Sequence, residues 1–210
     1  MRSAAALLET GVWVIGVLIY IWFLEPVRFW GQAWLGILLV YVVISWFQDK
    51  PTLREMGWRL DGFPAALRAA LYLAILFAVP LLLNGLLLHL PLPYGKMAKQ
   101  VAGYLGWALL QQSLLQSYVC VRLCEVWEDE WRVAVWAAFL FAVVHVPNPF
   151  LVTAGAFLGL STSLHFCRYR NVPVLALVHA LLAVLALYCT PAQVNGLMYV
   201  GPRYLNAFVK

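Results

Sequence analysis

Residues 64–88 read PAALRAALYLAILFAVPLLLNGLLL, and this segment alone identifies the solvent in which the chain folds. Arg68 is its one charged residue, and nearly all the others are apolar. Because a helix rises about 1.5 Å per residue, roughly 20 apolar residues cross a hydrocarbon layer about 30 Å thick. The segment is therefore long enough to span a membrane as one helix. Pro64 suits the first turn of that helix, where no backbone N–H donor is needed.

The rest of the chain has a similar composition. Hydrophobic residues make up 64% of its 210 residues and charged residues 11%, whereas a soluble domain carries about 25% charged residues. So few charges would not keep a folded domain dispersed in water. We therefore expect an all-α integral membrane protein, a polytopic transmembrane helix bundle whose single membrane domain covers residues 1–210.

Seven apolar segments follow one another and predict about seven transmembrane helices. Residues 52–63 differ in kind because charged and apolar residues are interleaved there, which indicates a short segment lying in the headgroup region. Residues 91–99 and the acidic residues 125–130 are expected to be loops, and a polar tail ends the chain. The seven segments are residues 8–24, 33–47, 64–88, 101–123, 132–146, 150–166 and 172–188.

The net charge of +5 comes from basic residues in the short loops. There they indicate topology and contacts with lipid headgroups, and no nucleic-acid motif accompanies them. With seven crossings, nine basic residues fall on the side of the N-terminus and five on the other, which predicts a cytoplasmic N-terminus. The nine are Arg2, Lys50, Arg54, Arg59, Arg68, Arg122, Arg132, Arg168 and Arg170, and the five are Arg28, Lys96, Lys99, Arg203 and Lys210.

The four cysteines are Cys120, Cys124, Cys167 and Cys189, and no two of them show the CxxC spacing. All four lie in or beside apolar segments. A free cysteine in that setting usually behaves as a small buried hydrophobe. We expect neither a disulfide nor a metal role for them.

Polar side chains interrupt three of the apolar segments. Such side chains are costly inside a membrane, and they usually face the interior of the helix bundle. Counted from the helix ends at about 1.5 Å per residue, Gln111 lies roughly 16 Å deep, His145 roughly 20 Å and His179 roughly 10 Å. These depths predict one internal site. The side chains are Gln111, Gln112 and Gln116 in residues 101–123, His145 in residues 132–146 and His179 in residues 172–188.

Purely structural roles for the same residues stay open at this point. Glutamine inside a membrane is often a hydrogen-bonding link between helices, worth about 1 kcal/mol. His145 precedes Pro147 and suits a helix end, while His165 and His89 are expected to be structural. A metal site is disfavoured because zinc usually takes three or four His, Cys or carboxylate ligands. We expect no metal and no cofactor.

In order and spacing these residues resemble the CAAX protease and bacteriocin-processing (CPBP) family of intramembrane endopeptidases. Three elements on successive helices characterise that family: Glu-Glu-x-x-x-Arg, Phe-x-x-x-His, and a His followed four residues later by Asn or a similar residue. The resemblance covers residues 53–188. The matching positions are QQSLLQ at residues 111–116, Phe141 with His145 and the following Val-Pro-Asn148, and His179 with Ala183.

The resemblance implies a membrane endopeptidase that acts on a peptide or membrane-protein substrate, in a bacterial plasma membrane. In the family, the first Glu and the second-element His activate a water molecule, and the later His and Asn stabilise the oxyanion. A carboxylate and an imidazole can share that proton transfer, and fixed donors stabilise the developing charge. The corresponding residues are Gln111, Gln112, His145 and His179, with Gln116, Phe141 and Asn148 in supporting positions.

This chain departs from the family pattern at four positions. Glutamine stands at both Glu positions, Gln116 at the Arg position and Ala183 at the Asn position. Glutamine accepts no proton at any usable pH. The joint loss of Glu and Arg is coherent, because an Arg without a carboxylate would be an unpaired buried charge.

Three functions follow as alternatives from this pattern. The first is an endopeptidase in which His145 is the base, Gln111 or Gln112 orients the water and His179 stabilises the oxyanion. The second is a catalytically inactive relative that serves as a scaffold, chaperone or partner subunit. The third is a small transporter, which would need a continuous polar path, although polar residues are few in the first three segments. The expected partners are membrane lipids and a peptide or membrane protein, and not nucleic acid.

Overall fold

The computed structural model describes residues 2–25 and 27–209. Met1, Pro26 and Lys210 lie outside the described residues, as do the side chains of Arg2 and Arg28. The topology expectations that depend on Arg2, Arg28 and Lys210 therefore fall outside the description. Within the described ranges all regular secondary structure is helical.

Each of the seven apolar segments is helical. α4 (Tyr94–Gln112), the π-helical η2 (Ser113–Cys120) and α5 (Val121–Cys124) follow without a break and form one long helix. The other elements are α1 (Arg2–Ile19) with η1 (Tyr20–Leu24), α2 (Arg28–Asp49), α3 (Phe63–Leu87), α6 (Glu130–Val143), α7 (Pro149–Tyr169), α8 (Val172–Cys189), α9 (Ala192–Asn195), η3 (Gly196–Met198) and α10 (Gly201–Phe208).

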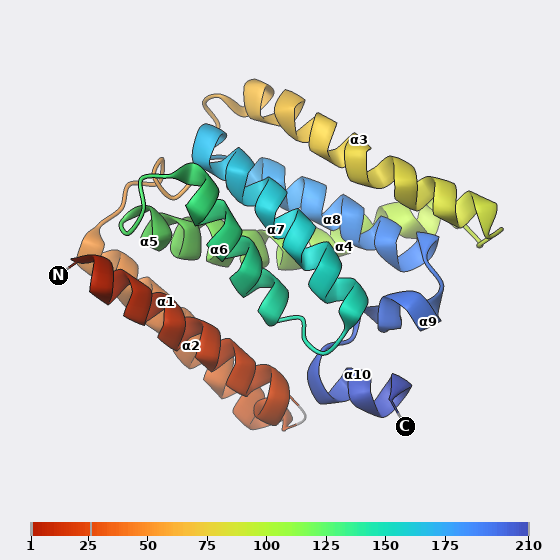
Figure 1. The fold of residues 1–210 in the computed structure, drawn as a ribbon, viewed down its shortest axis with the longest axis horizontal. Helices are drawn as coiled ribbons and strands as arrows, with labels where there is room; N and C mark the ends of the chain where they lie inside the picture. Colours follow the sequence, from red (N-terminus) through yellow and green to blue (C-terminus); the bar gives the residue numbers. More distant parts are fainter. Residues whose placement is uncertain (1, 26, 210) are drawn as a thin grey trace.

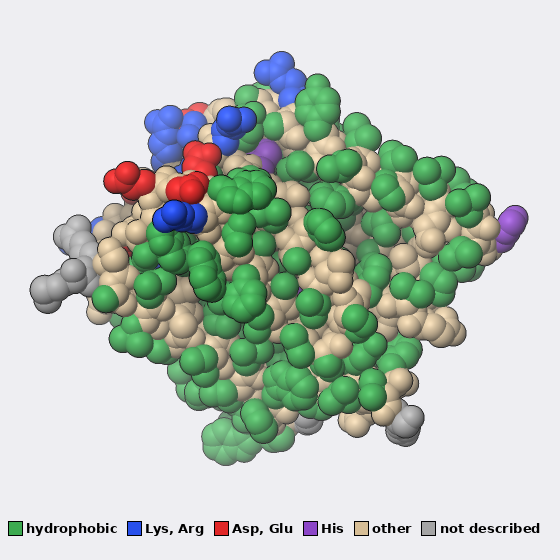
Figure 2. Space-filling model, in the orientation of Figure 1, with side chains coloured by type: hydrophobic (Ala, Val, Ile, Leu, Met, Phe, Trp, Pro, Cys, Tyr) green, Lys and Arg blue, Asp and Glu red, His purple; other side chains and the backbone are tan. Residues whose placement is uncertain are grey.

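Five helices in the described ranges are long and apolar enough to cross a membrane. They are Ser3–Leu24, Phe29–Asp49, Phe63–Leu87, Pro149–Tyr169 and Val172–Cys189. Hydrophobic side chains cover most of the face drawn in Figure 2, while charged side chains gather at its upper left. An apolar outer surface of this kind suits lipid rather than water. The expectation of an all-helical membrane protein is therefore confirmed.

The expected loop at residues 91–99 is wrong from Tyr94 onward, because α4 already begins there. Met97 explains the difference, since its side chain is buried in a cluster with residues of α3 and α8. Lys96 and Lys99 lie on the other faces of the first turns, so these turns looked like a polar loop in the sequence. The expected polar tail likewise contains helices α9 and α10.

Three α-helices begin at a polar side chain that caps a backbone N–H group. Such caps satisfy donors that have no partner inside the helix. These caps fix the short turns that precede α6, α7 and α8. The bonds join Asp129 to the N–H of Trp131 (2.9 Å), Asn148 to that of Leu151 (3.1 Å) and Asn171 to that of Val174 (3.2 Å).

α8 is the central helix of the bundle. It packs against α3 on one side and α4 on the other, while α6 packs against α7 (Figure 1). In the most apolar window of α8, 67% of the residues are buried, against 17% in α3 and in the span that contains α1. The α1–α2 pair lies at the edge of the bundle in Figure 1, so these helices and α3 mainly face lipid.

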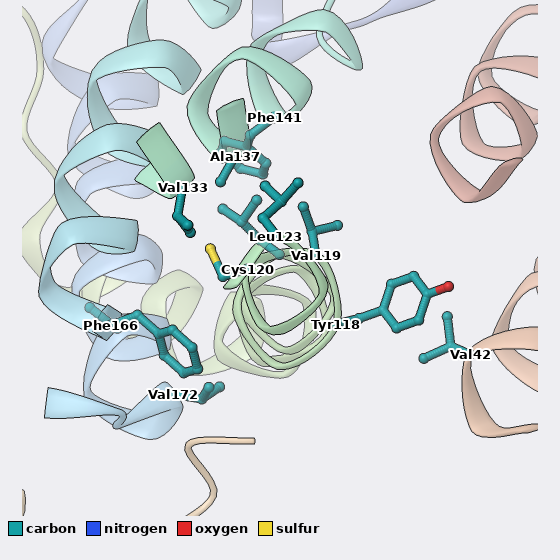
Figure 3. Packing of buried hydrophobic residues seen from close by; sticks show 12 residues of the cluster. Val42, Tyr118, Val119, Cys120, Leu123, Val133, Ala137, Phe141, Phe166 and Val172 are labelled. Atoms are coloured by element: carbon teal, nitrogen blue, oxygen red, sulfur yellow. The ribbon is translucent and has the colours of Figure 1, made fainter. Parts of the chain in front are cut away.

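The long α4–η2–α5 helix forms the middle of the largest apolar cluster. Figure 3 looks along this helix and shows side chains of several neighbouring helices around it. Val133, Ala137 and Phe141 come from α6, and Phe166 from α7, while the Tyr118 ring points towards Val42 of α2. Gln112, Gln116 and Ser117 of the same helix are fully buried in this packed region.

Candidate functional site

Two cavities meet at one wall inside the bundle. The α3-side cavity has a volume of about 310 Å³ and lies between α3, α7 and α8. The α4-side cavity has a volume of about 360 Å³ and lies between α1, α4, α6 and α8. Six residues line both cavities and form what we call the shared wall: Phe141, His145, Leu151, His179, Ala183 and Met198.

His145 follows the last turn of α6, and its ring nitrogen Nδ1 lies 2.6 Å from the carbonyl oxygen of Phe141. A carbonyl oxygen only accepts hydrogen bonds, so Nδ1 carries the proton. In the neutral ring, Nε2 is then left with a free lone pair. The Phe141 ring meets the imidazole edge to face, with centroids 4.8 Å apart, and this contact holds the ring in place. His145 is therefore oriented as a proton acceptor.

His179 lies in the middle of α8 and is held in the opposite tautomer. Its Nδ1 lies 3.2 Å from Nε2 of Gln112. The Gln112 oxygen Oε1 accepts a hydrogen bond from Nε2 of Gln116 at 3.1 Å, so the amide nitrogen of Gln112 faces the ring. An amide nitrogen donates, so Nδ1 of His179 accepts and the proton is on Nε2. His179 is therefore oriented as a hydrogen-bond donor.

The orientation of Gln116 is fixed in turn by two neighbours. Its Nε2 also donates to the Thr162 hydroxyl at 3.1 Å, and the Thr162 hydroxyl donates onward to the Leu158 carbonyl at 2.8 Å. Its Oε1 accepts from the Cys120 thiol at 3.1 Å. Gln112 and Gln116 are both fully buried. Each amide in this chain therefore donates to the next group: Gln116 donates to Gln112, and Gln112 donates to His179.

Gln111 points away from this chain and lines the α4-side cavity. Its Oε1 accepts from the Tyr104 hydroxyl at 3.4 Å, which leaves the amide N–H groups free to act in the cavity. Tyr104 lines the same cavity and was missed in the sequence, although its position seven residues before Gln111 places both on one helix face. Gln111, His145 and His179 thus border one cavity, whereas Gln112 borders neither cavity and contacts His179 instead.

Asn148 and Phe141, the other supporting residues, hold the shared wall in place. Nδ2 of Asn148 donates to the carbonyl oxygens of Asn195 and Tyr199, both at 3.0 Å. These bonds fasten the segment that carries Met198 to the start of α7. The Phe141 ring also meets the His179 ring, with centroids 5.9 Å apart. Asn148 therefore acts on the site through the backbone, while Phe141 contacts both histidines.

Arg122, one of the basic residues counted on the side of the N-terminus, has a side chain that is buried at the end of the long helix. Its Nε lies 3.2 Å from Glu9, and its Nη1 lies 2.9 Å from Glu125. Its Nη2 also binds Asp49 and the Ser45 hydroxyl. Three carboxylates surround one guanidinium, so the charge is compensated by residues of α1 and α2 that sequence spacing does not reveal.

Neither a candidate metal site among the described residues nor a comparison with known proteins points to a function. In the part of the chain that the structure describes, no group of three or more His, Cys, Asp or Glu side chains is placed to hold a metal ion. Comparison with protein-family models, curated proteins and solved structures gave no match. The function is therefore inferred from the geometry of the site and from the residue pattern.

Proposed function

We propose that this chain is an intramembrane endopeptidase-like protein of the CPBP type, in which His145 and His179 act together on a peptide bond. The observation that carries the proposal is the pair of contacts on one shared wall: Nδ1 of His145 lies 2.6 Å from a carbonyl oxygen, and Nδ1 of His179 lies 3.2 Å from an amide nitrogen. These contacts assign opposite tautomers to the two rings. One ring presents a lone pair to the cavity and the other a proton. Hydrolysis of an amide needs these two complementary groups, a base for the water and a donor for the oxyanion.

In this mechanism, Nε2 of His145 takes a proton from a water molecule as the water oxygen attacks the peptide carbonyl carbon. The carbonyl oxygen becomes an oxyanion that accepts a hydrogen bond from Nε2–H of His179. The C–N bond then breaks, and His145 returns the proton to the leaving nitrogen. Gln111 orients the water through its amide group. Gln112 does not face the cavity and acts as a positioning residue for His179.

The substrate is a peptide segment of a membrane protein. The α3-side cavity is lined by apolar side chains such as Phe77, Pro80 and Phe157, which suit apolar substrate side chains. The α4-side cavity adds Tyr104 and Gln111, which suit a peptide backbone because both can hydrogen-bond to it. The histidines lie where the two cavities meet, so the bond to be cleaved would lie between an apolar and a more polar half of the segment.

The proposed topology has seven crossings, with the α4–η2–α5 helix and α6 added to the five apolar spans. The N-terminus is cytoplasmic and the protein lies in a bacterial plasma membrane. Lys50, Arg54, Arg59, Arg168 and Arg170 support this orientation, because they lie at one end of the bundle. Reporter fusions in residues 125–130 and after the last residue should report opposite compartments, and a common compartment would contradict seven crossings.

A catalytically inactive relative that binds peptides is the second candidate. It is favoured by a specific observation, since none of the six residues of the shared wall is a carboxylate. A lone histidine is a weaker base for this reaction than a histidine paired with a glutamate. Such a protein would keep the cavities and serve as a scaffold, chaperone or partner subunit.

Cleavage of a quenched fluorescent membrane peptide by the purified protein in liposomes separates the two candidates. His145→Ala should lower the rate by about 10²–10⁴-fold, as loss of a general base usually does. His89→Ala is the matched control, because His89 is exposed in the turn after α3 and should keep the full rate. A silent wild type, or a His145→Ala variant as fast as wild type, would reject the histidine mechanism.

Restoring the acid tests the inactive alternative directly. The Gln112 and Gln116 side chains already bond to each other at 3.1 Å, so Glu at 112 and Arg at 116 would form an ion pair. A buried Glu without that Arg would be a carboxyl group with no partner for its charge. We expect Gln112→Glu/Gln116→Arg to be more stable than Gln112→Glu alone. Gln111→Glu should give an inactive wild type some activity, since position 111 faces the cavity.

A further inference from the structure

A third cavity lies at the charged end of the bundle, apart from the histidine site. Its volume is about 590 Å³, and it lies between the end of α2, the loop that follows α2, α5 and the end of α7. Charged side chains in Figure 2 gather near this end, close to the loops that join α2 to α3 and α5 to α6. Eight charged residues line this charged cavity: Asp49, Lys50, Arg54, Glu55, Arg59, Arg122, Glu125 and Arg170.

One wall of the charged cavity carries a negative excess. Asp49 and Glu125 line it and both bind the Arg122 guanidinium, which also binds Glu9. One positive charge therefore stands against three carboxylates. Asp49 and Glu125 each use one oxygen for Arg122, Oδ2 and Oε1 respectively. This wall suits a cationic group that donates hydrogen bonds.

Another part of the lining, the second wall, carries a positive excess. Lys50, Arg54, Arg59 and Arg170 line it, against the carboxylates of Glu55 and Asp61. Oε2 of Glu55 is already bound to the backbone N–H and hydroxyl of Thr52, at 2.7 and 2.8 Å. Arg170 is held by a 2.8 Å bond from Nη1 to the backbone oxygen of Glu55. This wall suits an anion such as a phosphate.

Two buried polar atoms on lining residues lack a hydrogen-bond partner among the described residues. They are Nε1 of Trp46 and the hydroxyl oxygen of Tyr118. Tyr118 is only 1% exposed, so its hydroxyl is not freely hydrated. The cavity does not expose these two atoms, so they are not placed to bind a ligand there. The charged residues that line the cavity are what indicate a polar ligand.

We propose that the charged cavity binds a phosphate ester that carries a primary ammonium group, the chemistry of an aminophospholipid headgroup. The phosphate lies against Lys50, Arg54 and Arg170, and the ammonium donates to Asp49 and Glu125. The cavity lies where α2 ends at Asp49 and α7 ends at Tyr169. Lipid headgroups lie at that level of a membrane. The proposal does not depend on the peptidase activity.

Native mass spectrometry of the full chain in detergent tests this assignment. The probes are phosphatidylethanolamine, phosphatidylcholine and phosphatidylglycerol with the same acyl chains, and soluble phosphoethanolamine. Phosphatidylethanolamine should bind at least about fivefold tighter than the other two lipids. Phosphatidylcholine lacks ammonium N–H donors and phosphatidylglycerol lacks the cation. Phosphoethanolamine that binds as tightly as the lipid would assign the site to a soluble ligand of the same chemistry, and weaker binding would assign it to the lipid.

Variants on the two walls separate the two halves of the headgroup. Lys50→Gln/Arg54→Gln should weaken phosphatidylethanolamine about tenfold, and both side chains are exposed enough for the fold to tolerate the change. Glu125→Gln should remove the preference over phosphatidylglycerol, because the amide still accepts from Arg122 but carries no charge. Arg132→Gln, at a side chain 68% exposed outside the cavity, is the control and should change nothing. Equal binding of all three lipids, or unchanged binding by the double variant, would overturn the proposal.

Discussion

The long α4–η2–α5 helix carries two buried polar clusters of different chemistry. At Gln112 and Gln116 the cluster is neutral and is built from amides, a hydroxyl and an imidazole. Ten residues after Gln112, at Arg122, it is ionic and holds three carboxylates. At about 1.5 Å per residue the two lie about 15 Å apart along the helix. The same helix therefore carries a neutral cluster in the packed interior of the bundle and an ionic cluster near its end.

The exposure of the partners accounts for the difference. The carboxylate side chains of Glu9, Asp49 and Glu125 are 30%, 48% and 36% exposed, so water still reaches the ion cluster. Gln112 and Gln116 are fully buried. A charge at the membrane centre costs several kcal/mol, whereas a closed network of dipoles costs much less. Charged residues at position 112 would thus need buried counter-charges to balance them. The neutral chain of amides needs none.

The largest effect is expected at the ionic cluster. Arg122→Gln would leave Glu9, Asp49 and Glu125 close together without a cation, and it should lower the free energy of unfolding by about 3 kcal/mol. Thermal or denaturant unfolding in detergent measures this loss. Arg132→Gln removes an exposed arginine that is 3.6 Å from Asp129, and it should stay within about 0.5 kcal/mol of wild type. Equal losses in the two variants would show that burial of Arg122 is energetically irrelevant.

The neutral cluster should respond less. Gln116→Leu keeps the volume but removes the donor to Gln112 and Thr162 and the acceptor for Cys120, and we expect a loss of about 1–2 kcal/mol. Gln32→Leu, at an exposed glutamine of α2, is the control. A spectroscopic readout of the His179 tautomer should change in Gln116→Leu, because Gln112 loses the bond that orients its amide. A larger loss than in Arg122→Gln would reverse the ranking of the two clusters.

A conservative change separates charge from geometry in the ionic cluster. Arg122→Lys keeps the positive charge but supplies a single nitrogen. The guanidinium uses three nitrogens, one each for Glu9, Glu125 and Asp49. We expect a loss of about 1 kcal/mol, since the attraction persists and the planar arrangement of donors does not. The same unfolding experiment tests this value. A loss as large as that of Arg122→Gln would mean that geometry, rather than charge, holds the cluster together.

The smallest effect is expected in the loop between α2 and α3. Hydrogen bonds from Thr52 lower the pKa of Glu55 below its ordinary 4.5, and the Arg59 guanidinium lowers the pKa of Asp61 below its ordinary 3.8. A lowered pKa stabilises the folded loop above the ordinary value, and this contribution is lost as pH falls through the folded pKa. Amide hydrogen exchange of residues 52–62 should therefore speed up in acid relative to α8. Asp61→Asn should show part of that increase at pH 7.

Apolar segments in the sequence predicted the helices well, because hydropathy depends on each segment alone. Polar residues were harder to place, since their environment depends on other helices. Arg122 was counted only as a topology charge near the end of the segment 101–123, and nothing local marks Glu9 and Asp49 as its partners. Tyr104 was not singled out in the sequence, although it bonds to Gln111 in the cavity. The first turns of α4 looked like a polar loop because lysines lie on both sides of Met97 in the sequence, although the Met97 side chain is buried.

The predicted site residues do not all share one environment. Gln111, His145 and His179 border one cavity, and their catalytic roles stay a prediction. The separation of Gln111 from Gln112 was not predictable, because neighbours in a helix differ by about 100° in direction and the sequence does not say which faces the cavity. The tautomers were also beyond the sequence, since that of His179 depends on an amide chain anchored at Thr162 of α7.

The π-helical segment η2 has a consequence for how these amides meet their partners. In an α-helix, positions four apart drift round the axis by about 40°, so a row at every fourth residue winds away from its partners. A π-helical turn holds more residues and turns less at each one. Over η2 the row Gln112, Gln116 and Cys120 therefore does not wind round the axis in the sense that a regular α-helix would give it. All three reach the line where α7 and α8 supply Thr162, Ser163 and His179.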